Sequence, residues 1–75
     1  MKKVLVFFNS QPVEVINTLK AINTIRREYP DGQEEHLRIR LAGMHSVSNR
    51  SVEIHIASDK ELTSEEIIKA ANQFL

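Results

Sequence analysis

Charged side chains and a histidine recur at alternate positions in two stretches of the chain, and their types suit binding rather than bond-breaking chemistry. Arg38 and Arg40 alternate with apolar residues in one stretch, and Glu53 and His55 do so in the other. On an open sheet face, such cations pair with phosphates, and an aromatic ring such as that of Phe7 stacks on a base. The predicted candidate ligand face therefore consists of Phe7, Arg38, Arg40, Glu53 and His55.

The alternative interpretation, without a ligand, is a solvated sheet face on which Glu53 pairs with Arg38 or Arg40 across two strands. Ten basic and ten acidic residues cancel to a formal net charge of zero, which argues against a dedicated duplex-DNA binder. The chain also lacks the glycine- and aromatic-rich signature of an RNA-recognition strand. A module that binds single-stranded nucleic acid is therefore the alternative function, and a protein partner is favoured.

Residues that would carry catalysis or hold a metal are scarce. The chain has no cysteine, which excludes thiolate chemistry and thiolate metal sites, and it fits a cytoplasmic protein. The spacing of His36, His45 and His55 matches no metal-ligand pattern, and the serines near His45 lack a GxSxG elbow. We predict no enzyme, no catalytic residue, no metal and no cofactor.

The turn Asn9-Ser10-Gln11 precedes a predicted helix, a position at which backbone N–H groups bind anions. It contains no glycine to let a phosphate approach, and Pro12 removes one donor. A capped helix start is therefore the favoured interpretation of this turn.

The longest apolar run of the chain is Val4–Phe8 near the amino terminus. It is shorter than the roughly 7–15 apolar residues of a signal peptide and far too short to span a membrane. Branched and aromatic residues followed by Asn9-Ser10 predict a buried strand. Because this strand is apolar on both faces, we expect both faces to be covered.

A helix is predicted over residues 12–29, with Pro12 in its first turn. Its apolar residues recur at spacings of three and four and form one stripe: Val15, Ile16, Leu19, Ile22, Ile25 and Tyr29. The sequence Tyr29-Pro30-Asp31-Gly32 is expected to end the helix in a turn.

Two alternating stretches, residues 36–42 and 50–57, predict an antiparallel hairpin joined by a loop over residues 44–49. The residues expected to point inward are Leu37, Ile39, Leu41, Val52, Ile54 and Ile56. Gly43 is expected to break the first strand or to form a bulge in it. A second helix should begin after Thr63, which with Glu66 forms a capping box, and end near Phe74.

These elements predict a single α+β domain over residues 1–75, a two-layer β-α-β-β-α sandwich with both helices on one face of a three-stranded mixed sheet. The arrangement resembles a ferredoxin-like fold without its last strand. We favour the strand order 1-3-2 over the sequential order, and both orders place the first strand at an edge.

An apolar strand at a sheet edge is an aggregation hazard that pairing with a second copy removes. We therefore predict a homodimer, or a protein partner bound by strand addition, at the edge formed by Val4, Leu5, Val6, Phe7 and Phe8. The predicted function is a small cytoplasmic, non-catalytic interaction module with no membrane partner.

Overall fold

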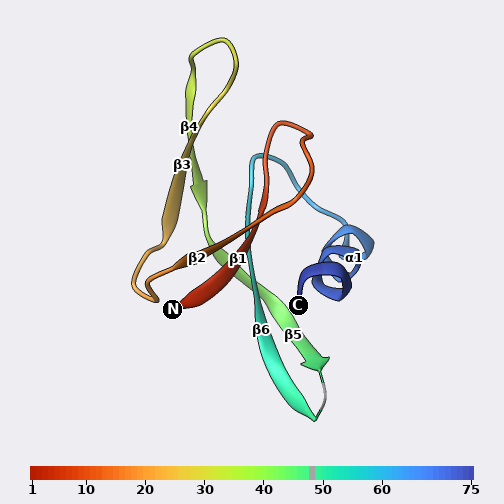
Figure 1. Ribbon diagram of the computed structural model, residues 1–75. Coiled ribbons are helices and arrows are strands. Elements are labelled where there is room, and N and C mark those ends of the chain that lie inside the picture. The colour runs from red at the N-terminus through yellow and green to blue at the C-terminus, as the bar shows by residue number, and fades with distance from the viewer. Residues whose placement is uncertain (48) are drawn as a thin grey trace.

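The computed structural model describes residues 1–47 and 49–75, and the side chains of His45 and Val47 are not among the described parts. Its elements, in chain order, are β1 (Lys2–Phe7), β2 (Glu14–Thr18), β3 (Thr24–Glu28), β4 (Glu34–Arg38), β5 (Arg40–Val47), β6 (Arg50–Ser58) and α1 (Ser64–Phe74). Four strands form a sheet in the order β2-β1-β6-β5, and β3 and β4 form a separate hairpin (Figure 1). The predicted β-α-β-β-α sandwich with two helices is therefore wrong, because the described chain is mostly β-structure with one helix.

Strand β1 lies inside the four-stranded sheet. It pairs antiparallel with β2 in a register that joins Lys2 to Thr18, and parallel with β6 in a register that joins Val4 to His55. Both of its backbone edges are thus occupied within the chain. The prediction that β1 forms an exposed edge is wrong, although β6 still lies between β1 and β5 within this different fold.

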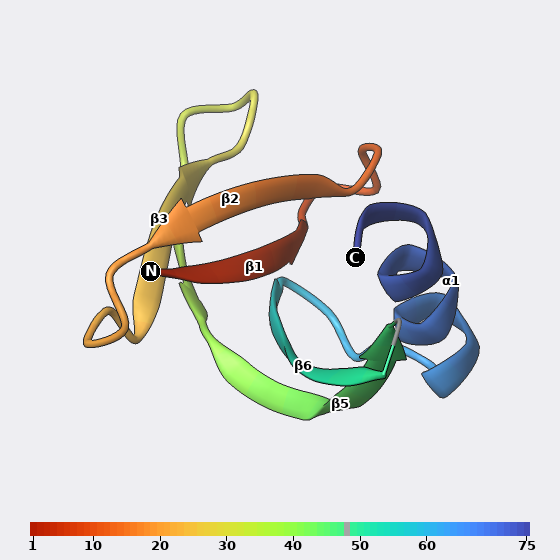
Figure 2. The ribbon, with the colours of Figure 1, turned by 60° about the horizontal axis from the view of Figure 1, so that its bottom comes forward.

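The two faces of β1 contribute to two separate hydrophobic clusters. Leu5 and Phe7 pack with residues of β6 and with Ala70 and Ala71 of α1, and this group is called the α1 cluster below. Val4 and Val6 pack against the β3–β4 hairpin, which contributes Ile25 and Leu37, and against Ile39. This second group is called the hairpin cluster below. The expectation that both faces of the strand are covered is confirmed, and Figure 2 shows the helix and the hairpin on different sides of the curved sheet.

Residues 12–29 form β2 and β3 instead of the predicted helix. Seven of these eighteen residues are Val, Ile or Thr, whose branched side chains favour strands over helices. The packing follows strand alternation, since Val15 lies against the α1 cluster and its neighbour Ile16 against the hairpin cluster. A helix would have kept both of these residues on one stripe.

The turn predicted at Tyr29–Gly32 is present, but it closes the β3–β4 hairpin. The Gly32 N–H donates to the Tyr29 carbonyl at 2.9 Å, and the Gln33 N–H donates to the Asp31 carboxylate at 3.0 Å. Gly32 has a φ of 91°, a conformation that residues with a Cβ rarely adopt.

The antiparallel pairing of β5 with β6 is present, but its faces differ from the prediction. The single predicted strand over residues 36–42 is divided into β4 and β5 at Ile39. Leu41 lies opposite His55 and is 57% exposed, instead of pointing inward. The register shifts between Leu41 and Gly43, which confirms the bulge expected there. The predicted loop over residues 44–49 is β5 as far as Val47, and Ser48 lies outside the described residues.

The carboxyl-terminal helix follows its sequence signals. Thr63 is the N-cap, and its hydroxyl accepts the Glu66 N–H at 3.1 Å, so the predicted cap is confirmed. Ala70 and Ala71 are the residues that the helix buries against the sheet. Spanning eleven residues, the one helix described is too short and too polar to cross a bilayer.

Candidate functional site

The residues of the predicted ligand face do not share one surface. Phe7 is 8% exposed and packs in the α1 cluster, so its ring is not available to stack on a base from the opposite face. Arg38 ends β4 and Arg40 begins β5, and both are exposed. These two arginines line a shallow depression together with Ser58, which ends β6, and with the loop residues Asp59, Lys60 and Glu61.

Glu53 and His55 form a pair of their own on β6. The His55 Nε2 lies 3.0 Å from a Glu53 carboxylate oxygen, and the side chain of His55 is only 16% exposed. Their neighbours across the strand pair are Met44, opposite Glu53, and Leu41, opposite His55. The predicted face is thus divided into the arginine depression, the Glu53–His55 pair and a buried Phe7.

The outer edge of β5 is a functional candidate that the sequence interpretation missed. Strand β5 ends the sheet, so its outer backbone groups have no strand partner among residues 1–47 and 49–75. Leu41 and Met44 on this strand are 57% and 59% exposed. Gly43 was the available signal, because a bulge beside it changes which residues share a face.

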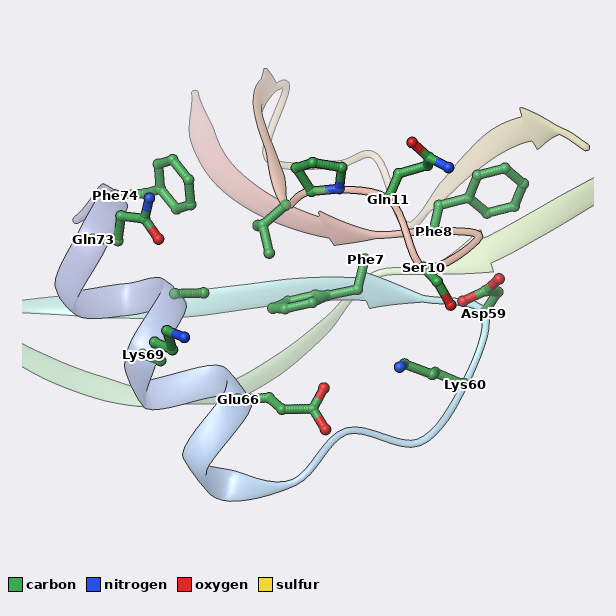
Figure 3. A pocket seen from close by; sticks show the side chains of 13 residues that line it. Phe7, Phe8, Ser10, Gln11, Asp59, Lys60, Glu66, Lys69, Gln73 and Phe74 are labelled. Carbon is green, nitrogen blue, oxygen red and sulfur yellow. The ribbon is translucent and has the colours of Figure 1, made fainter.

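A cavity of about 400 Å³ lies between α1, the turn after β1 and the loop before α1. Its apolar lining includes Phe7, Val13, Ala70 and Phe74, and its polar rim includes Asp59, Lys60, Glu66 and Lys69 (Figure 3). The volume is within the range of small-molecule sites. No sequence motif marked this cavity, because its lining comes from two stretches far apart in the chain, residues 7–13 and 59–74.

Asp59 connects the turn after β1 with Tyr29 beside this cavity. One of its carboxylate oxygens accepts the Asn9 N–H at 2.9 Å and the Tyr29 hydroxyl at 3.2 Å. Its own N–H donates to the Phe7 carbonyl at 3.2 Å. The rings of Tyr29 and Phe8 pack with their centroids 4.5 Å apart. Asp59 therefore positions the turn after β1 and the Tyr29 side chain, in addition to lining the cavity.

Tyr29 provides a direct measure of the Asp59 contact. Desolvation raises the pKa of Tyr29 above its ordinary value of 10.0, and the hydrogen bond and negative charge of Asp59 raise it further. Because the folded state favours the neutral phenol, this contribution to stability is present below about pH 10 and is lost as pH rises through the elevated pKa.

Replacing Asp59 with Asn should therefore lower the pKa of Tyr29 towards 10.0, with a smaller decrease for Asp31→Asn, whose charge contributes least. Tyr29 is the only tyrosine and there is no tryptophan, so ultraviolet absorbance reports its ionisation directly. An unchanged titration curve for the Asp59→Asn variant would contradict the contact.

Among the described residues, neither the histidines nor the turn after β1 forms a binding site. No three His, Asp or Glu side chains gather into a metal-binding group within the described part of the chain. The side chain of His45 lies outside that part. The turn after β1 is closed by the Gln11 N–H, which donates to the Phe8 carbonyl at 3.0 Å. A strand follows this turn, so the helix dipole that would attract an anion is not there.

The family assignment rests on the carboxyl-terminal two thirds of the chain. The profile of the YnfN protein family matches residues 26–74. The chain belongs to the YnfN protein family. The uncharacterized protein YnfN of Escherichia coli (strain K12) is 43% identical over 49 residues, which are 65% of this chain and 96% of that protein. No solved structure matches the chain.

The residues that match the YnfN family contribute to the β3–β4 hairpin, to the sheet and to the helix. It includes β4, β5, β6 and α1, and therefore the free β5 edge. Strands β1 and β2, with Phe7 and Val13, precede it. The cavity is thus formed jointly by the matched and the unmatched parts of the chain.

Proposed function

We propose that the protein is a non-catalytic interaction module that associates with a second copy of itself through the outer edge of β5. The observation that carries this proposal is the combination of an unpaired strand edge with two exposed apolar side chains, Leu41 and Met44. This interface lies at β5 and not at β1, because both edges of β1 are paired within the chain.

The composition of β5 favours pairing with another strand. Of its eight residues only Arg40 carries a full charge, and the strand contains neither lysine nor proline, the residues that commonly protect an edge. The opposite edge of the sheet, β2, is shorter and carries Glu14, whose carboxylate is held by Arg27 at 2.6 Å. The two edges therefore differ in how well they are protected.

The bulge in β5 places the apolar side chains for such an interface. Residues three apart on a regular strand point to opposite faces. Here Leu41 lies opposite His55 and Met44 opposite Glu53, so both share the face that is turned away from α1. Two copies related by a two-fold axis would align these residues in a continuous eight-stranded sheet, with the same patch on each copy.

Replacing Met44 with Lys should weaken this association by about tenfold or more, because two ammonium groups would meet at the two-fold interface. The measurement is sedimentation equilibrium over a range of concentrations, in which the wild-type chain should approach twice its mass of 8.6 kDa.

The matched control is Ile68→Lys on α1, since Ile68 is 55% exposed and Met44 is 59% exposed. The same charge added there should leave the association constant unchanged. Equal effects of the two substitutions, or a wild-type chain that stays at 8.6 kDa up to millimolar concentration, would contradict the proposal.

A further inference from the structure

We propose that the cavity between α1 and the turn after β1 binds a small amphipathic carboxylate, an anion with an apolar body. This site is separate from the β5 edge, so its test and that of self-association can fail independently. The cavity of about 400 Å³ combines an apolar floor with four charged side chains on its rim.

The floor of the cavity specifies the body of the ligand. Phe7 and Phe74 contribute rings, and Val13 contributes a branched side chain from the segment before β2. A ligand body that displaces water from these groups would gain the free energy of apolar burial. An aromatic or branched hydrocarbon body meets this requirement, and a purely polar ion does not.

The rim specifies the charge of the ligand. Both acids are already engaged, because Asp59 accepts two hydrogen bonds at 2.9 and 3.2 Å and a Glu66 carboxylate oxygen lies 3.3 Å from the Thr63 hydroxyl. The ammonium groups of Lys60 and Lys69, in contrast, have no carboxylate within salt-bridge distance among the residues described.

Figure 3 shows Lys60 and Lys69 on opposite sides of the Phe7 ring, with the Glu66 side chain between them. Two unpaired cations adjacent to an apolar floor favour a ligand whose single negative charge lies at one end. The nearby carboxylates of Asp59 and Glu66 would repel a dianion more strongly than a monoanion. A monoanionic carboxylate therefore fits better than a phosphate monoester.

The test is an amide NMR titration of the intact chain with 4-phenylbutyrate, with its uncharged amide and with acetate as matched probes. The acid should produce saturable shifts at Phe7, Lys60, Lys69 and Ala70, with a Kd on the order of 1 mM for a ligand of this size. The amide should bind about tenfold more weakly, and acetate should cause no saturable shift.

Variants assign the charge to the two lysines. Lys60→Gln and Lys69→Gln should each weaken 4-phenylbutyrate binding by about two- to fivefold, as expected for partly exposed ion pairs. Lys20→Gln, an exposed lysine that does not line the cavity, should leave the Kd unchanged. The spectra of the free variants show whether each remains folded.

Three results would overturn the proposal. Equal affinity for the acid and its amide would show that the lysines do not select an anion. Saturable shifts centred outside the cavity would place the ligand elsewhere, and shifts that never saturate would show that no site exists.

Discussion

Replacing Leu5 with Ala is expected to destabilise the folded chain by about 2–5 kcal/mol, the usual range for a fully buried leucine. Leu5 is 1% exposed and lies on the central strand, where its backbone neighbours are Val15 on β2 and Ile56 on β6. A 75-residue chain has a total unfolding free energy of about 4–11 kcal/mol. The substitution should therefore remove a large part of the stability, and it should lower the urea midpoint measured by far-ultraviolet circular dichroism.

The control for this effect is Leu19→Ala. Leu19 is 63% exposed in the connection after β2, so the same truncation there should change the unfolding free energy by less than about 0.5 kcal/mol. If the two variants had the same urea midpoint, Leu5 would not be in the core, and the central position of β1 would be wrong.

Replacing Leu37 with Ala should produce a loss of similar size, about 2–5 kcal/mol, through the other hydrophobic cluster. Leu37 on β4 is 1% exposed and packs with Val4 and Val6, so it attaches the β3–β4 hairpin to the sheet. We expect hydrogen exchange in the hairpin to accelerate more than in β6, because β6 keeps its pairing with β1 and β5.

Ile22→Ala is the matched comparison for the hairpin, since Ile22 precedes β3 and is 40% exposed. It should leave amide exchange in β3 and β4 close to that of the unaltered chain. Uniform acceleration throughout the molecule in the Leu37→Ala variant would show that the hairpin is not a separately attached unit. Because Leu5 and Leu37 lie in different clusters, their effects should add within about 0.5 kcal/mol.

The elements with strong local signals could be predicted from sequence. The apolar run at β1 predicted a strand that is covered on both faces, and the Thr63–Glu66 capping box predicted the start of α1. The alternation over residues 50–57 indicated β6 to within one residue. In each case the local pattern and the tertiary packing favour the same structure.

The helix predicted over residues 12–29 is wrong because the apolar pattern of this segment fits both a helix and strands. Val15, Ile16, Leu19 and Ile22 fit a helical stripe by spacing, yet the branched side chains among them favour strands. The decision depended on a tertiary fact, namely that β1 needs an antiparallel neighbour on one side and β6 on the other. With the helix in place of β2, the predicted sheet left β1 at an edge.

The candidate sites depended on these errors. The association surface predicted at Val4–Phe8 requires β1 to lie at a sheet edge, and both edges of β1 are paired within the chain. The exposure of Leu41 follows from its register with β6, which places it opposite His55 instead of Ile56, and the alternation over residues 36–42 alone does not specify that register. The cavity needs Phe7, Val13 and Lys69 to meet, which only the complete topology specifies.

The most direct test of the account is an isotope-filtered NOE experiment on an equal mixture of labelled and unlabelled chains. We expect the contacts of β1, including Leu5 with Ile56 and Leu5 with Val15, to be intramolecular, and contacts between copies to appear at Leu41 and Met44. Intermolecular contacts at Val4–Phe8 would contradict the account, because they would show that β1 is an edge that a second copy covers.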